Sequence, residues 1–153
     1  LYDFRIHEVK PYYLDEKSIS STKIRTAIND GAIDLANNYL GYNFTLTDKV
    51  IKGKGVGHSL GFPTANIKIE NKYKIIPKKG VYAVNVYHGG NKYGGMLNIG
   101  INPTFNQNKI SIEVNIFDFN KSIYNEEVKI EYIKRIRNEN SIRFAIPAEA
   151  LGP

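Results

Sequence analysis

The stretch Ile110-Ser111-Ile112-Glu113-Val114-Asn115-Ile116 alternates apolar and polar residues without a break. Because successive side chains of a strand point to opposite faces, this pattern predicts a half-buried β-strand whose aliphatic residues face a core. Ser111, Glu113 and Asn115 share the other face, where plain solvation is the simplest expectation. Glu113 becomes a candidate functional residue if that face also borders a binding site.

Similar short segments, rich in Val, Ile, Tyr, Thr and Phe and bounded by Gly, Pro or Asn, fill the chain after residue 41. No helical pattern separates them, which argues against a parallel sheet. His88-Gly89-Gly90-Asn91 is typical of a hairpin turn. Since closure removes exposed sheet edges, we expect a mainly β fold built as a small closed antiparallel barrel. The expected strands are Phe44–Lys52, Thr64–Glu70, Val81–His88, Lys92–Ile99, Lys109–Phe119 and Val128–Arg135.

The first forty residues predict a different structure. Residues 4–10 indicate a short strand, and Ser or Thr at 20–22 would cap a helix within Lys17–Asp30 that ends at Gly31. A second helix would end at Gly41. Its expected apolar and aromatic residues are Ile33, Ala36, Tyr39 and Leu40. Gly41-Tyr42-Asn43 then marks a junction between domains.

Composition excludes several classes of protein. The 153 residues include no cysteine, so disulfide frameworks, thiol catalysis and zinc–thiolate sites are ruled out. No apolar run is long enough to span a bilayer, and we expect a cytoplasmic protein without a membrane partner. The net charge is +6, but the basic residues are scattered, which favours a solvated surface over a nucleic-acid groove. Because the chain begins with Leu1, we expect a fragment, a processed product or a trimmed version of a longer protein.

The stretch 53–66 joins a glycine-rich loop to Pro63-Thr64-Ala65-Asn66. Alternating glycines let backbone N–H groups approach a polyphosphate closely, although a glycine-rich turn between strands is the simpler explanation by spacing alone. The loop is not a Walker A loop, because Gly-x-x-x-x-Gly-Lys-Ser/Thr is absent, and it is not a dinucleotide fingerprint, because His58 takes the place of the third glycine. Thr64 and Asn66 share one face of a strand, and both offer neutral oxygens of the kind that Mg2+ accepts beside water and phosphate. Together these features suggest phosphoryl transfer.

A second polar stretch, Asn98-Ile99-Gly100-Ile101-Asn102-Pro103-Thr104-Phe105, is rich in turn-forming residues. Its composition predicts a loop that connects two strands, with the wall of a binding site as the alternative. Asp118 falls near the end of an expected strand and is expected to cap a turn. His7 and His88 have no partner at motif spacing, and no chemistry is assigned to them.

Residues 41–139 resemble the riboflavin kinase domain, and most closely the kinase module of bacterial bifunctional FAD synthetases. Of the matching segments, Gly61-Phe62-Pro63-Thr64-Ala65-Asn66 is the most specific. The others are Pro77–Ala83, Asn98–Gly100, Pro103–Phe105, Glu113 within Ile112–Phe119, and Arg137 with Glu139. Residues 1–40 resemble the end of the preceding FMN adenylyltransferase domain through Ile19–Arg25 and Leu40-Gly41. The expected division is 1–40, a kinase barrel at 41–142, and an atypical tail at 143–153, a cloning remnant or a truncation.

The resemblance implies a six-stranded Greek-key barrel that transfers the ATP γ-phosphoryl group to the 5′-hydroxyl of riboflavin, giving FMN. Glu113 would be the general base, Thr64 and Asn66 would contact Mg2+ and phosphate, and a parent protein would also make FAD through its adenylyltransferase domain. This chain alone is not expected to transfer adenylyl groups. The implied nucleotide-binding residues are Gly53, Gly55, Gly57, His58, Gly61, Pro63, Thr64 and Asn66. The implied flavin-binding residues are Asn98, Glu113 and Arg137.

The chain departs from the family pattern in two places. Val56 and His58 stand where relatives often carry Arg, and Pro147 would interrupt the helix that usually follows the barrel. The alternative hypothesis is a small basic β-barrel that stacks single-stranded nucleic acid on its 11 Tyr and 7 Phe. A barrel that serves only as an inactive scaffold is a third reading.

Overall fold

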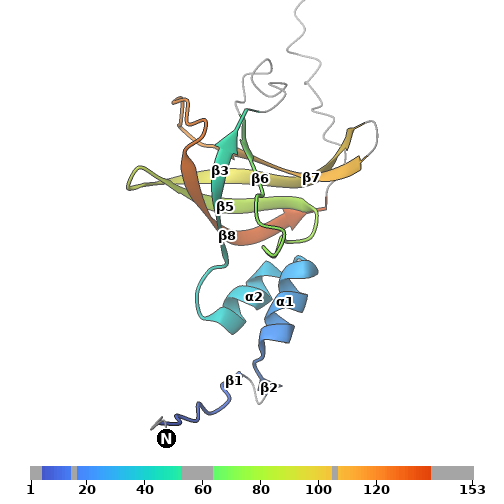
Figure 1. Cartoon of the computed structure of the whole chain (residues 1–153), viewed down its shortest axis with the longest axis vertical. Helices are drawn as coiled ribbons and strands as arrows, with labels where there is room; N and C mark the ends of the chain where they lie inside the picture. Colours follow the sequence, from blue (N-terminus) through green and yellow to red (C-terminus); the bar gives the residue numbers. More distant parts are fainter. Residues whose placement is uncertain (1–4, 15–16, 53–63, 105–106, 139–153) are drawn as a thin grey trace, which may run out of the picture.

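The strand signals after residue 41 form a closed antiparallel barrel in the computed structural model of the chain, which describes residues 5–14, 17–52, 64–104 and 107–138. The strands follow the order β3-β4-β7-β6-β5-β8 around the barrel (Figure 1). They are β3 Thr45–Ile51, β4 Thr64–Ile67, β5 Gly80–His88, β6 Asn91–Thr104, β7 Gln107–Ile116 and β8 Glu127–Arg137. Because β8 returns beside β5 after the β5-β6-β7 meander, the predicted Greek key is confirmed.

The interior of the barrel is filled mainly by the apolar phase of its strands, with Tyr82 and Tyr132 among the largest buried side chains. On β7, Ile112, Val114 and Ile116 are buried as the alternation predicts, while Ile110 at the start of the strand is 53% exposed. The hairpin between β5 and β6 is also confirmed. Gly89 and Gly90 both have positive φ there, at 55° and 79°, as a tight turn that matches the strand twist requires.

One predicted loop is a strand. Asn98–Thr104 continues β6, which pairs with β5 from Asn91 to Ile99 and with β7 from Gly95 to Thr104. The turn-forming residues in this stretch are tolerated because the partner β7 supplies the backbone hydrogen bonds. Asp118, by contrast, lies in a turn with φ of 53°, as expected.

Two helices precede the barrel. α1, Ser21–Asn29, begins where the Ser20 side chain accepts a hydrogen bond from the Lys23 N–H at 3.3 Å, and α2, Ile33–Leu40, ends at Gly41 with φ of 75°. The strand predicted at 4–10 is wrong. Residues 5–10 have no regular structure and are exposed, and within the part of the chain that the structure describes no strand pairs with them. The N-terminal region instead holds the two-residue strands β1, Tyr13–Leu14, and β2, Lys17–Ser18.

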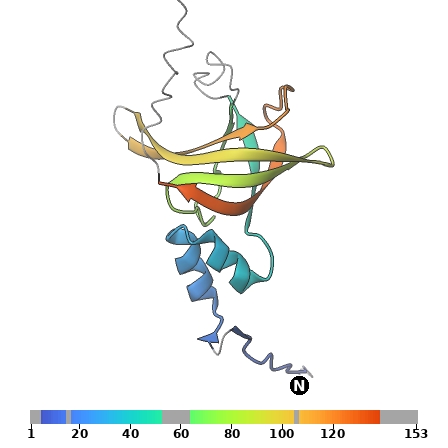
Figure 2. The same ribbon diagram turned by 180° about the vertical axis from the view of Figure 1, so that it is seen from behind.

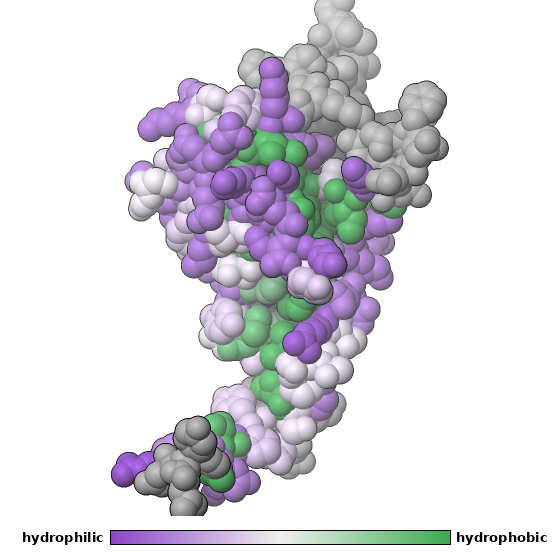
Figure 3. Space-filling model, in the orientation of Figure 1, coloured by the Kyte–Doolittle hydropathy of each residue, from purple (hydrophilic) through white to green (hydrophobic). Residues whose placement is uncertain are grey.

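The helices close one end of the barrel, as the view from behind shows (Figure 2). Ile33 of α2 belongs to the barrel core, and Asn37 fastens the helix to the barrel. Its Nδ2 donates to the Tyr132 carbonyl at 3.0 Å, and its Oδ1 accepts from the Phe44 N–H at 2.8 Å. Whatever the origin of residues 1–40, the helical pair is packed against the barrel. Figure 3, in the orientation of Figure 1, shows mostly polar residues over the barrel on that side, with apolar residues gathered on the helical segment below.

Tyr132 permits a stability prediction. Its ring packs against Phe44 and Tyr82, and among the described residues its buried hydroxyl has no hydrogen-bond partner. Burial also raises the pKa of Tyr132. Because an unpaired buried hydroxyl costs free energy, Tyr132→Phe should raise the free energy of unfolding by about 1 kcal/mol. Urea denaturation measures this, with Tyr82→Phe as the control: the Tyr82 hydroxyl donates to the Lys78 carbonyl, so that variant should lose stability.

Candidate active site

Three polar residues singled out by the sequence form one line across neighbouring strands. Asn66 on β4 pairs with Glu113 on β7, and Glu113 pairs with Asn98 on β6. Directly paired residues of antiparallel strands point to the same face, with Cβ atoms about 4.5–5.5 Å apart. Asn66, Glu113 and Asn98, here called the polar row, therefore lie side by side.

The polar row faces outward from the barrel. Ile112 and Val114, the neighbours of Glu113 along β7, are 1% and 0% exposed and point into the core. Because side chains alternate along a strand, Glu113 must point the other way. Every member of the row is partly buried, so the carboxylate stands at the surface without being fully solvated.

Arg137 extends the same line without touching Glu113. Beyond Asn98 the register runs through Val81 on β5 to Arg137 on β8, next to a β-bulge. Three strand spacings, about 14 Å measured around the curved surface of the barrel, separate β7 from β8, so Arg137 lies on the other side of the barrel from Glu113. Gly80 allows the end of β8 to approach β5, since its φ is 151° and a Cβ there would lie 2.6 Å from the Arg137 carbonyl oxygen. Arg137 itself is exposed.

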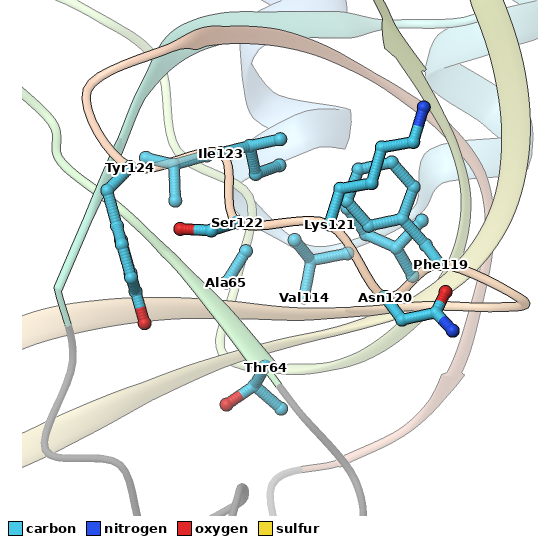
Figure 4. A pocket seen from close by; sticks show the side chains of 11 residues that line it. Thr64, Ala65, Val114, Phe119, Asn120, Lys121, Ser122, Ile123 and Tyr124 are labelled. Atoms are coloured by element: carbon cyan, nitrogen blue, oxygen red, sulfur yellow. The ribbon is translucent and has the colours of Figure 1, made fainter.

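A cavity of about 330 Å3 opens at the end of the barrel opposite the helices. Thr64 lines it and, two residues before Asn66 on β4, also lies beside the polar row. The cavity does not include Glu113. Its lining mixes apolar side chains, such as Val114 and Phe119, with polar ones, such as Thr64 and Ser122, as Figure 4 shows. The lining residues are Val50, Thr64, Ala65, Val114, Ile116 and the segment 119–124.

The segment 119–124 is a candidate functional element that the sequence analysis missed. It follows β7 and is tied to β3, because the Asn125 N–H donates to the Val50 carbonyl at 2.8 Å and the Val50 N–H donates to the Glu126 carbonyl at 2.9 Å. Ile123 anchors it in the core at 5% exposure. The sequence does contain one indication of its role: a connection between two clear strands that carries both polar and aromatic residues, as functional loops often do.

Several sequence-predicted residues lie outside the part of the chain that the structure describes. They are Gly53, Gly55, Gly57, His58, Gly61 and Pro63. The chain nevertheless enters this stretch from β3 and leaves it at Thr64, and both Val50 and Thr64 line the cavity. The tail at 143–153 also lies outside the described residues.

Glu131 forms a separate polar cluster on the outer face of β8. Hydrogen bonds to its carboxylate from Asn85 at 2.7 Å and Tyr87 at 3.0 Å, with a weaker one from Asn43, hold its pKa below the ordinary value. The stabilisation from this lowered pKa is present above the unfolded-state pKa of about 4.3 and is lost as pH falls through the folded-state pKa.

We therefore expect Glu131→Gln to be less stable than the parent chain at pH 7, with the difference shrinking between about pH 5 and pH 3. Urea denaturation at several pH values measures the difference. Glu127→Gln, an exposed position on the same strand, is the control. A difference that stays constant with pH would contradict the role given to the Glu131 carboxylate.

Comparison with known proteins assigns the family. The riboflavin kinase family model, Flavokinase, matches residues 40–146, which is more than half of the chain. The chain belongs to the riboflavin kinase family. It is 47% identical over 127 residues to the bifunctional riboflavin kinase/FMN adenylyltransferase of Bacillus subtilis, covering 81% of this chain and 40% of that protein. The protein of the same name from Escherichia coli strain K12 is 36% identical over 145 residues, covering 94% and 45%.

A solved structure agrees in fold. The crystal structure of a protein called macrolide-efflux protein from Streptococcus pneumoniae superposes with a TM-score of 0.81 at 38% identity, covering 88% of this chain and 44% of that one. The chain spans less than half the length of the curated relatives described above. Among its described residues, no helix is long and apolar enough to cross a membrane. The comparisons give the nucleic-acid-binding alternative no support.

Proposed function

We propose that this chain is an ATP-dependent riboflavin kinase whose reaction takes place at the polar row. The observation that carries the proposal is the register Asn66–Glu113–Asn98. It places Asn66, a candidate for binding Mg2+ and phosphate, and Asn98, a candidate for binding the hydroxyl groups of riboflavin, on either side of the Glu113 carboxylate. Family membership supplies the substrate pair, riboflavin and ATP.

The two substrates would meet at Glu113 from opposite sides. The cavity beside Thr64 has the mixed apolar and polar lining that suits a nucleoside, and from it a polyphosphate can pass Thr64 toward Asn66. On the other side, the flavin would extend from Glu113 past Asn98, on the outer face of β6. The ribityl end of the flavin would lie at Glu113 and the ring system nearer Arg137.

Glu113 would act as the general base. Its carboxylate would accept the proton of the 5′-hydroxyl while that oxygen attacks the γ-phosphorus, and the bond to the β–γ bridging oxygen breaks so that ADP leaves with the electron pair. Asn98, paired with Glu113, is placed to orient the ribityl chain by hydrogen bonding. Because phosphoryl transfer depends on positioning more than on covalent chemistry, a preformed row on strands suits the reaction.

Thr64 and Asn66 fit a magnesium site that is completed by the substrate. Both side chains carry neutral oxygens on the outward face of β4, and Mg2+ commonly takes one or two protein ligands beside waters and phosphates. Among the described residues no cluster of three His, Asp or Glu side chains could hold a metal alone. Bound there, Mg2+ would neutralise phosphate charge as the terminal group is transferred.

Asn66→Ala tests this assignment. Loss of one ligand should raise the magnesium concentration required for half-maximal turnover by about tenfold, with riboflavin binding unchanged. Titration of MgCl2 at fixed ATP measures the requirement. Asn71→Ala, in the connection that follows β4, is the matched control, and an unchanged magnesium requirement in Asn66→Ala would refute the metal role.

The direct test of the proposed function is FMN formation. The chain is incubated with riboflavin, ATP and MgCl2, and the flavins are separated by chromatography. The expected result is time-dependent FMN that requires both ATP and magnesium. Absence of FMN, when the same chain binds neither riboflavin nor MgADP by calorimetry, would overturn the proposal.

The role of the parent protein is a further part of the proposal. The curated relatives are bifunctional, so we propose that a longer parent protein also carries an adenylyltransferase domain, which converts FMN to FAD. With ATP as co-substrate and no cysteine in the chain, we place this activity in the cytoplasm.

A further inference from the structure

His88 has no motif partner in the sequence, yet in the structure its side chain contacts both a carboxylate, Glu126, and an aromatic ring, Phe119. It lies at the end of β5 with a side chain only 14% exposed. Its Nε2 stands 2.6 Å from Glu126 Oε2, and its ring meets Phe119 edge-on at 5.9 Å between centroids, with an interplanar angle of 86°. Tyr93 on β6 contacts the same Phe119 ring at 5.0 Å and 77°.

Phe119 is the member of this group that reaches the cavity. It lines the cavity wall at the start of the segment 119–124, whereas Tyr124 lies at the other end of that segment (Figure 4). Edge-to-face contacts from two directions fix the plane of a ring more narrowly than packing against aliphatic groups does. His88 and Tyr93 together therefore determine how Phe119 presents itself to the cavity.

Glu126 connects this arrangement to the other end of the segment. Its carboxylate holds His88, while its backbone carbonyl accepts from the Val50 N–H at 2.9 Å. The series of contacts from Glu126 through His88 to Phe119 thus links the residues just after the segment 119–124 to the first residue of that segment. None of these side chains lies in the polar row, so the arrangement can affect the cavity without touching the carboxylate at Glu113.

We infer that His88 is a positioning residue for the nucleotide: held by Glu126, it fixes the Phe119 ring as a wall of the cavity and so sets the affinity for the nucleoside part of ATP. The inference rests on the proposed function, in which this cavity takes the nucleoside. It assigns His88 to nucleotide affinity alone. Riboflavin affinity and the rate at saturating ATP are set elsewhere, along the polar row.

The test separates the two substrates. His88→Leu keeps apolar volume but removes both the ring and the partner of Glu126. It should raise KM for ATP and the calorimetric Kd for MgADP about two- to tenfold, the change expected when one aromatic edge contact is lost. KM for riboflavin and kcat at saturating ATP should stay within error. His88→Phe should recover part of the loss because it returns an aromatic edge.

Glu126→Gln keeps the test decisive if His88→Leu folds poorly. Glu126→Gln should move KM for ATP in the same direction by a smaller factor. Glu70→Gln is its matched control, because Glu70 pairs with Lys68 at 2.9 Å with a similarly exposed side chain, 52% against 54%, and lies outside the cavity lining. Adding His88→Leu to Phe119→Leu should cause no additional loss of ATP affinity. Melting temperatures establish that each variant is folded.

The outcomes distinguish this inference from the proposed function. If the parent chain makes FMN but neither His88→Leu nor Glu126→Gln changes KM for ATP, the inference is wrong and the kinase assignment stands. A rise in KM for both ATP and riboflavin, together with a fall in kcat, would also overturn it, since that result indicates general damage to the fold. If the parent chain binds neither MgADP nor riboflavin, the proposed function fails and the inference fails with it.

Discussion

Glu113→Gln should lower the rate of FMN formation by about 100- to 10,000-fold, the usual contribution of a general base. The amide is nearly the same size as the carboxylate, so the outward position on β7 between Asn66 and Asn98 should be retained. What the variant loses is the capacity to take the proton of the attacking hydroxyl. The rate is measured in single-turnover experiments, so that slow product release does not mask the chemical step.

Two controls accompany this variant. Glu127→Gln places the same change at an outward position of β8 that pairs with Lys49 on β3, and should keep full activity. Calorimetry should show that Glu113→Gln still binds MgADP in the cavity, because Glu113 does not line it. Turnover close to that of the parent chain would mean that another group accepts the proton, and the base assignment would be abandoned.

Lys74→Met should lower the free energy of unfolding by about 2–3 kcal/mol, which is the largest effect on stability expected here. Asp48 sits on the inward phase of β3 at 6% exposure, and Lys74 Nζ reaches its Oδ2 at 2.8 Å while also donating to the Thr47 carbonyl. Without Lys74 the buried carboxylate has no cation beside it. Because the Lys74 side chain is 31% exposed, the cost should fall below that of a fully buried pair.

Lys68→Met is the matched control for that prediction. Lys68 pairs with Glu70 at a similar distance, 2.9 Å, but both side chains are about half exposed, so the loss should stay below about 1 kcal/mol. The double variant Asp48→Leu/Lys74→Met should be more stable than Lys74→Met alone, since it removes the unpaired charge. Equal losses from the two single lysine variants, measured by urea denaturation, would show that burial of Asp48 is not the cause.

The barrel was predictable because its strands follow one simple rule. Alternation along 110–116 placed Ile112 and Val114 inside and Glu113 outside, and the structure agrees. The rule failed for Asn98–Phe105, where Gly and Pro suggested a loop. Residues 98–104 form a strand, because β6 needs only β7 as a partner beyond Ile99. The strand predicted at residues 4–10 is the opposite error. Residues 5–10 have a strand-like composition but form no strand, since no described strand pairs with them.

The candidate site was predictable only in part. Periodicity indicates that Thr64 and Asn66 share a face, but it cannot say that β4 lies beside β7 or in which register, so the proximity of Asn66 to Glu113 followed from the family resemblance alone. The cavity wall was missed for the same reason. His88 and Tyr93 lie on the β5–β6 hairpin and Phe119 follows β7, and it is the pairing of β6 with β7 that brings the three side chains together.

A crystal structure of the chain with riboflavin, Mg2+ and a non-hydrolysable ATP analogue tests the central claim most directly. The account predicts the 5′-hydroxyl within about 3 Å of the Glu113 carboxylate, the flavin ring extending over β6 and β5 toward Arg137, and the nucleoside in the cavity beside Thr64. A flavin seated inside that cavity, or on the face formed by β3 and β8 away from Glu113, would contradict it.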